Sequence, residues 1–252
     1  MDRTRKNLKI DSFEEEFKAA ATREGIAYDD FIELSRRPVA SLTEDELKLL
    51  YKINSSVELP QNNVILSKVV NEKDFRNCLK NGEFSETVGK CMTRMQDMQD
   101  CLTYEDYFNE LGLNYGSNQK YLPNGDANLS YNSFLDDNAM YIKRFVSSNT
   151  EDLAIRSFGG NTVDDVAKVM DAIGTDKTET IKLDMPYQGT GLTRDIEGGA
   201  GKFELYTKLD DAGKATYGKV ADGAAIYEVV RGVEGERLVA VRIRNNWYKV
   251  RY

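Results

Sequence analysis

The spacing of apolar residues changes along the chain from a helical period to strict alternation. Near the start, Phe13, Phe17 and Ala20 recur at intervals of three and four residues behind Ser12, which is suited to capping a helix. Thr43 occupies a similar position before an acidic turn and a second amphipathic stretch. The pattern predicts a small group of helices in the first quarter of the chain.

Alternating or β-branched segments dominate after Pro60. A β-branched run over residues 64–70 predicts a buried strand. Later helices are predicted at about 72–80, from 103 to about 111, and at 163–173, the last with Gly174 as its stop. Turns are expected at residues 232–235 and 245–246. The further predicted strands cover residues 87–94, 140–146, 153–156, 180–184, 202–208, 225–230, 237–243 and 247–252.

These elements predict an α+β fold with an N-terminal helical region followed by a mainly antiparallel, β-rich domain. We place the boundary between residues 1–58 and residues 59–252. Trp247, the single tryptophan, is expected to anchor the last hairpin in the core.

Composition and charge narrow the class of protein. The chain has 252 residues, of which 40% are apolar, and this suffices for a sizeable core. A net charge of −8 argues against a general nucleic-acid binder and suits a protein partner better. No segment has the length and apolarity of a membrane span, and the start carries no apolar signal segment. We therefore expect a cytoplasmic protein, or one delivered by a route that needs no N-terminal signal peptide.

The chain contains no histidine, and this excludes several kinds of site. Ser-His-Asp and Cys-His nucleophiles and imidazole zinc sites cannot be built, so acid–base chemistry falls to carboxylates, Lys, Tyr or Cys. Cys78, Cys91 and Cys101 lack metal-ligand spacing, and we interpret them as free thiols, with a Cys91–Cys101 pair as the alternative.

An order of residue types in the last hundred residues points to one enzyme class. Arg156 ends a predicted strand, Thr190 and Thr193 lie in a glycine-rich turn, and Glu234 and Glu236 form a Glu-x-Glu pair before the β-rich end. This order resembles the R-S-E class of mono-ADP-ribosyltransferases, a family that includes toxins and binds NAD in a cleft between two small sheets. The resemblance implies that Arg156, Thr190 and Thr193 bind NAD, that Glu236 is catalytic and that Glu234 orients the acceptor.

A second arrangement of the same resemblance uses an earlier part of the chain. Lys68 on the strand at 64–70 stands in place of the arginine, Thr93 and Arg94 lie on the Ser/Thr strand, and Glu204 is the acid. The two arrangements conflict and both remain open, with Glu236 favoured over Glu204.

The chemistry explains why these residue types are needed together. Breaking the bond between nicotinamide and ribose develops positive charge on the ribose, which a nearby carboxylate stabilises, while a cation holds the diphosphate. The resemblance thus implies an NAD-consuming toxin or effector domain that modifies a protein, from a bacterium or a phage. The alternative is a non-enzymatic structural or interaction protein of a phage or secretion system. On that reading four basic residues near the end of the chain face solvent and protect the edge of the sheet from pairing with other chains. These residues are Arg242, Arg244, Lys249 and Arg251.

Overall fold

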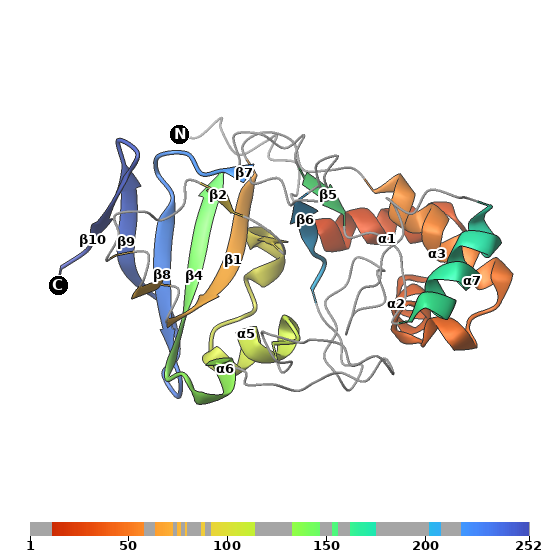
Figure 1. Cartoon of the computed structure of the whole chain (residues 1–252), viewed down its shortest axis with the longest axis horizontal. Helices are drawn as coiled ribbons and strands as arrows, with labels where there is room; N and C mark the ends of the chain where they lie inside the picture. The colour runs from red at the N-terminus through yellow and green to blue at the C-terminus, as the bar shows by residue number, and fades with distance from the viewer. Residues whose placement is uncertain are drawn as a thin grey trace, which may run out of the picture.

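The computed structural model confirms the α+β class and places the N-terminal helices at one end of the molecule and the main sheet at the other (Figure 1). It describes residues 12–57, 64–72, 75–76, 79, 87–88, 92–113, 133–146, 153–155, 162–174, 202–207 and 218–251. Among these residues no helix is both long and apolar enough to cross a membrane.

The N-terminal helices form where the sequence predicts them, because their ends are capped. Ser12 accepts a hydrogen bond from the N–H of Glu15, and Thr43 forms a reciprocal capping box with Glu46. Acidic first turns add favourable charge at both helix N-termini. The elements are α1 (Phe13–Arg23), α2 (Tyr28–Arg36), the short 3-10 turn η1 (Val39–Ser41) and α3 (Glu44–Ser56).

The helix predicted at 163–173 is also present and joins this group. Helix α7 (Val163–Ile173) begins with a capping box between Thr162 and Asp165 and ends at Gly174, whose φ of 67° favours glycine. It packs against α3, far along the chain but adjacent in space (Figure 1).

The main sheet has six strands, all antiparallel, in the order β10-β9-β8-β4-β1-β3. Its strands are β1 (Ile65–Asn71), β3 (Thr93–Arg94), β4 (Ala139–Val146), β8 (Ala225–Val230), β9 (Arg237–Ile243) and β10 (Asn246–Lys249). Two smaller sheets pair β2 (Thr87–Val88) with β7 (Gly218–Lys219), and β5 (Leu153–Ile155) with β6 (Leu205–Thr207).

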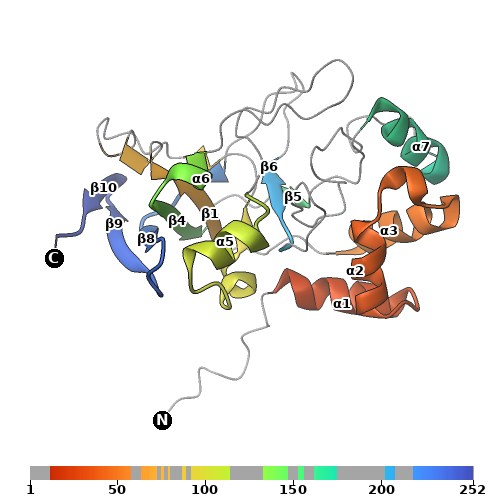
Figure 2. The same cartoon turned by 90° about the horizontal axis from the view of Figure 1, so that it is seen from below.

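One face of the main sheet is covered by short helical segments. Helix α5 (Tyr104–Glu110) lies beside this part of the sheet (Figure 2). Its Tyr104 and Tyr107 form one buried cluster with Met140 and Ile142 of β4. The 3-10 turn η2 (Met95–Met98) and α6 (Ser133–Asp136) adjoin it. The opposite face buries Tyr141, Ile226 and other residues in a separate cluster.

The helical region and the β-rich part share the largest core cluster. Phe17 of α1 stacks on Phe31 of α2 at 5.6 Å and on Phe203, which precedes β6, at 4.0 Å between ring centroids. The same cluster takes in Leu66 of β1 and Phe145 of β4. The proposed boundary between 1–58 and 59–252 stays a prediction, and the shared core links the two parts physically.

Two sequence predictions about strands need correction. The strand expected over 87–94 is divided: its first residues pair with β7 and its last with β1. The final turn is centred on Arg244 and Asn245, one residue earlier than expected, because these two residues adopt positive φ and Asn246 already pairs with Ile243. The predicted strand at 180–184 lies outside the described residues, as does much of the region around 72–80.

The register of the last hairpin also overturns one prediction about charge. Arg242 lies opposite Trp247 and is only 2% exposed, so it does not face solvent. Residues 238–241 before it are all apolar, so no alternation in the sequence decides which face of β9 is buried. The other three basic residues, Arg244, Lys249 and Arg251, are exposed as expected.

Trp247 packs against two of the core clusters, whereas its neighbour Tyr248 is 51% exposed. We expect Trp247→Ala to lower the free energy of unfolding by about 2–3 kcal/mol, because a large aromatic contact is lost. The matched variant Tyr248→Ala should change it by about 0.5 kcal/mol or less, since it removes little buried surface. Denaturant unfolding of both variants measures this, and equal losses would contradict the assigned register.

Candidate functional site

Three segments far apart in sequence meet at one edge of the main sheet. Strand β3 pairs with β1, setting Arg94 opposite Leu66 and Thr93 opposite Ser67. Directly before β3, Met92 forms a two-way backbone bridge with Leu205: the N–H of Met92 donates at 2.9 Å and the N–H of Leu205 at 2.6 Å. The main sheet thus meets the small β5-β6 sheet at this point.

The meeting of these segments brings the backbone positions of the second sequence arrangement near one another, with Lys68 and Arg94 on one face of the main sheet and Thr93 on the other. We call Lys68, Thr93, Arg94 and Glu204 the junction residues. Lys68 follows the paired Ser67 on β1, and Glu204 directly precedes the bridged Leu205. Arg94 is 1% exposed and Glu204 6% exposed, so a cation and a carboxylate are held at the junction in surroundings of low polarity.

Arg94 also fastens α1 to the sheet. Its Nη1 donates to Oε1 of Glu16 at 2.8 Å, and its guanidinium lies 3.7 Å from the ring centroid of Phe13. The ion pair compensates part of the desolvation of the buried guanidinium. Sequence analysis did not identify Glu16, although its position in the acidic first turn of α1 marks it as a partner for a cation.

Asp97, another residue that sequence analysis missed, caps α1 from outside the helix. Its Oδ1 accepts from the hydroxyl of Ser12 at 2.5 Å, and its Oδ2 accepts from the N–H of Phe13 at 3.0 Å. Burial raises the pKa of the Asp97 carboxyl, and the hydrogen bonds from Ser12 and Phe13 oppose that rise. No local sequence signal pairs residue 97 with a helix that begins at residue 13.

Glu236, the acid of the first arrangement, lies in a different cluster. The carboxylate cluster consists of Tyr107 on α5, Arg144 on β4 and Glu236 at the entry to β9. Oε1 of Glu236 accepts from the Tyr107 hydroxyl at 2.5 Å and from Nη2 of Arg144 at 2.7 Å. The Arg144 guanidinium also lies 4.7 Å from the ring centroid of Tyr227. Glu236 is thereby fixed and neutralised by its neighbours.

The environment of Tyr107 makes it a hydrogen-bond donor rather than an acid. Burial, together with the hydrogen bond to Glu236, raises the pKa of its phenol far above the ordinary value. Glu234, the other acid of the Glu-x-Glu pair, is exposed in the turn before β9. The other predicted members of the first arrangement, Arg156, Thr190 and Thr193, lie outside the described residues.

Three cations lie on one face of the main sheet, on β1, β4 and β9. Lys68 and Lys143 are direct cross-strand neighbours on β1 and β4. Lys143 is 3% exposed, with Nζ 5.5 Å from the ring centroid of Trp247, and the register places Arg242 on the same face. We call Lys68, Lys143 and Arg242 the cation row. Arg242 is itself paired with Asp222, its Nε lying 3.9 Å from Oδ1 of that carboxylate.

Cys101, the cysteine that the structure describes, is not a candidate nucleophile. Cys101 is a free, buried thiol, and burial raises its pKa to about 12. It is therefore protonated at neutral pH and unsuited to nucleophilic attack, whereas Cys78 and Cys91 lie outside the described residues. Within the described ranges no group of three or more acidic or cysteine side chains is arranged to hold a metal ion.

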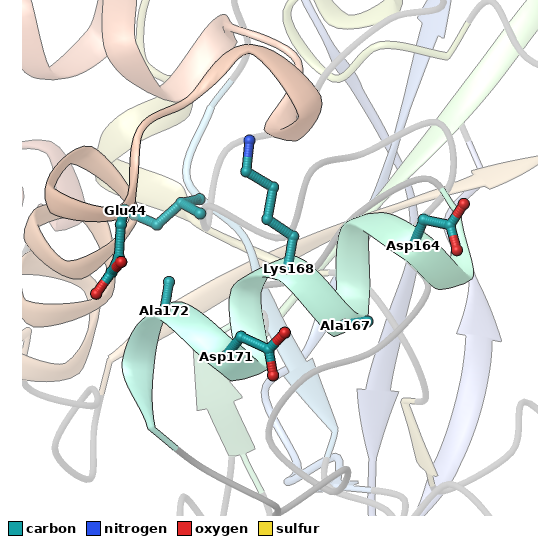
Figure 3. Close-up of a pocket in the computed structure, with 7 residues that line it drawn as sticks. Glu44, Asp164, Ala167, Lys168, Asp171 and Ala172 are labelled. Atoms are coloured by element: carbon teal, nitrogen blue, oxygen red, sulfur yellow. The ribbon is translucent and has the colours of Figure 1, made fainter.

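A hollow of about 450 Å³ lies between α3 and α7 (Figure 3). Lys168 extends from α7 across this hollow, and its Nζ donates to the carbonyl oxygens of Val39 and Ala40 at 3.2 and 2.9 Å. This contact attaches α7 to the N-terminal helices. The lining residues are Glu44, Leu47, Asp164, Ala167, Lys168, Asp171 and Ala172.

The environment of Asp97 predicts a pH effect on stability. Because folding raises its pKa, Asp97 contributes stability below its unfolded pKa, near 4, and loses that contribution as the pH rises through its folded pKa. Asp97→Asn removes this titration. We therefore expect the stability difference, wild type minus variant, to shrink as the pH rises from about 4 to about 7.

Unfolding measured across this pH range tests the prediction, with Asp100→Asn as the control because Asp100 is exposed nearby. A wild-type advantage that grows with pH would show that hydrogen bonds to the carboxylate outweigh its burial.

Comparison with known proteins identifies no relative of this chain. The chain matches no protein-family model, no curated protein and no solved structure. Inference about function therefore rests on the arrangement of the residues described above.

Proposed function

We propose that the protein is an NAD-consuming mono-ADP-ribosyltransferase-like toxin or effector domain that modifies a protein, with its centre at the junction residues. One observation carries the proposal: the bridge between Met92 and Leu205 joins, where two sheets meet, the three segments that hold a lysine, a threonine, an arginine and a glutamate. The R-S-E resemblance requires such a set of residue types at the meeting of two sheets.

Glu204 is the proposed catalytic acid. A carboxylate fixed at the junction stabilises positive charge on the ribose as the bond from its C1′ to nicotinamide breaks. The bonding electrons leave with nicotinamide, and a nucleophilic side chain of the target protein then forms the new bond to C1′. Burial supports this role, since electrostatic stabilisation is stronger in surroundings of low polarity.

The cation row supports the binding half of the proposal. Lys68 and Lys143 lie side by side on β1 and β4, and a diphosphate bound at this face would meet two cations. Lys68 belongs to both the junction and the row, so it links the proposed catalytic and binding groups. The aromatic ring of Trp247 adjoins the row near Lys143.

The non-enzymatic alternative is favoured by a different observation. Arg94 is already engaged with Glu16 and Phe13, and Glu236 with Arg144 and Tyr107. Charged groups engaged by an opposite charge in this way are typical of residues that hold a fold together. On this reading the same residues position a rigid interaction surface.

Release of free nicotinamide from NAD distinguishes the two functions. We expect the wild type to consume NAD in the presence of a suitable acceptor protein. Glu204→Gln should reduce turnover about a hundred- to a thousandfold, because it removes a preorganised charge. Glu236→Gln tests the competing arrangement, and Glu33→Gln on the exposed side of α2 is the control.

Each variant must first show the melting temperature expected of a folded protein. Loss of activity in Glu236→Gln alone would transfer the catalytic role to Glu236. Equal activity in the wild type and all three variants would remove both glutamates from the mechanism. Absence of turnover by the wild type with a broad set of acceptor proteins would favour the interaction protein.

A further inference from the structure

The β9–β10 hairpin differs in charge from the rest of the protein. It lies at the end of the main sheet away from α1–α3 and α7 (Figure 1). The chain has a net charge of −8, yet residues 237–251 contain no acidic residue. Its basic residues are Arg237, Arg242, Arg244, Lys249 and Arg251. Arg237 is paired with Glu228 and Arg242 is buried, so the other three give the hairpin an exposed positive surface.

The turn of the hairpin holds an arginine in an unfavourable backbone conformation. Arg244 and Asn245 have φ of 50° and 64°, where asparagine and glycine are preferred. The Asp222 carboxylate stabilises the turn by accepting from the N–H of Arg244 at 2.7 Å and that of Asn245 at 2.8 Å. The Arg244 guanidinium forms no ion pair with any described residue. A strained position that projects an exposed cation suggests a use for that cation.

Exposed apolar side chains adjoin this positive tip. Ile243 and Tyr248 are each 51% exposed. Tyr248 lies opposite Val241, two residues from Ile243 on β9, so all three share the face opposite to Arg242 and Trp247. Tyrosine and arginine surrounding an aliphatic residue are typical of the energetically important centre of a protein interface.

No strand of the described residues pairs with the outer side of β10. Strand β10 is the last strand at this edge of the described sheet. The N–H of Val250 donates to the carbonyl oxygen of Val239 at 2.9 Å. Because hydrogen-bonding groups alternate in direction along a strand, the preceding residue, Lys249, directs its N–H and C=O away from β9. An extended segment of another protein can add to such an edge.

We propose that the β9–β10 hairpin docks an extended acidic segment of a partner protein. The segment lies along the outer edge of β10, with its carboxylates near Arg244, Lys249 and Arg251 and an apolar side chain over Ile243 and Tyr248. Charge complementarity identifies the partner's chemistry, since the exposed charges of the hairpin are all positive. The proposal does not depend on NAD chemistry.

Two other occupants are less well supported. Nucleic acid would be repelled by the net charge of −8, and the basic surface is confined to one hairpin. A second copy joined edge to edge would bring two sets of positive side chains together. Both are outcomes of the test below.

The test measures binding of a fluorescent random copolymer of glutamate and tyrosine to the purified full chain by anisotropy. We expect saturable binding that weakens with salt, and a dissociation constant about tenfold higher for Arg244→Glu. Arg36→Glu, with the same charge change on exposed α2, is the control and should change it less than about twofold. Ile243→Ser should weaken binding about fivefold. Val163→Ser, at an exposed position of α7, is its control and should leave binding unchanged.

Arg244→Asn separates binding from folding. Asparagine suits positive φ, so this variant should melt at a higher temperature than the wild type and still bind the copolymer more weakly. Equal binding by the hairpin variants and their controls would overturn the proposal. Tighter binding of single-stranded DNA than of the copolymer would also overturn it. A homodimer whose association becomes stronger in Arg244→Glu would overturn it as well.

Discussion

The buried guanidinium of Arg94 is the constraint on which the arrangement of the two halves depends. A charge that is 1% exposed needs partners, and Glu16 and the ring of Phe13 supply them from α1. Asp97 holds the start of the same helix through Ser12 and Phe13. Together these contacts fix α1 against β3 and η2, so that Phe17 can stack on Phe203 in the shared core. Loss of the Glu16 charge would leave the buried Arg94 guanidinium without this ion-pair partner.

The same constraint shapes the candidate site. Arg94 and Thr93 form β3, the two-residue edge strand whose preceding residue bridges to Leu205. The contacts that hold α1 therefore also hold the position of Glu204. Rigid support of this kind is what a preorganised carboxylate requires, and it serves an interaction surface equally well. Strand β3 therefore links the packing of α1 to the position of the proposed catalytic Glu204.

Sequence reasoning succeeded where the physical signal is local. The caps at Ser12 and Thr43, the glycine stop at Gly174 and the strand-forming runs of the terminal meander all act within a few residues, and each appears in the structure. The α+β class follows from these signals.

The candidate site could not be predicted in the same way, because its contacts join residues that are far apart in the sequence. The bond between Ser12 and Asp97 spans 85 positions, and that between Tyr107 and Glu236 spans 129. No periodicity encodes such pairings. The burial of Arg242 was missed because the apolar run before it leaves the choice of face to the packing of the whole sheet.

The order of strands in the main sheet has a consequence for how the chain folds. Strand β4 lies between β1 and β8, each of which is separated from it by a long stretch of sequence, whereas β8, β9 and β10 are consecutive. Nonlocal pairing requires costly loop closure, so the terminal meander and the capped helices can form before the centre of the sheet is complete. During synthesis β4 cannot gain its β8 neighbour until Val230 has left the ribosome. Until then one edge of the central strand is open to pairing with other chains, and this interval is when the protein is most exposed to misassembly.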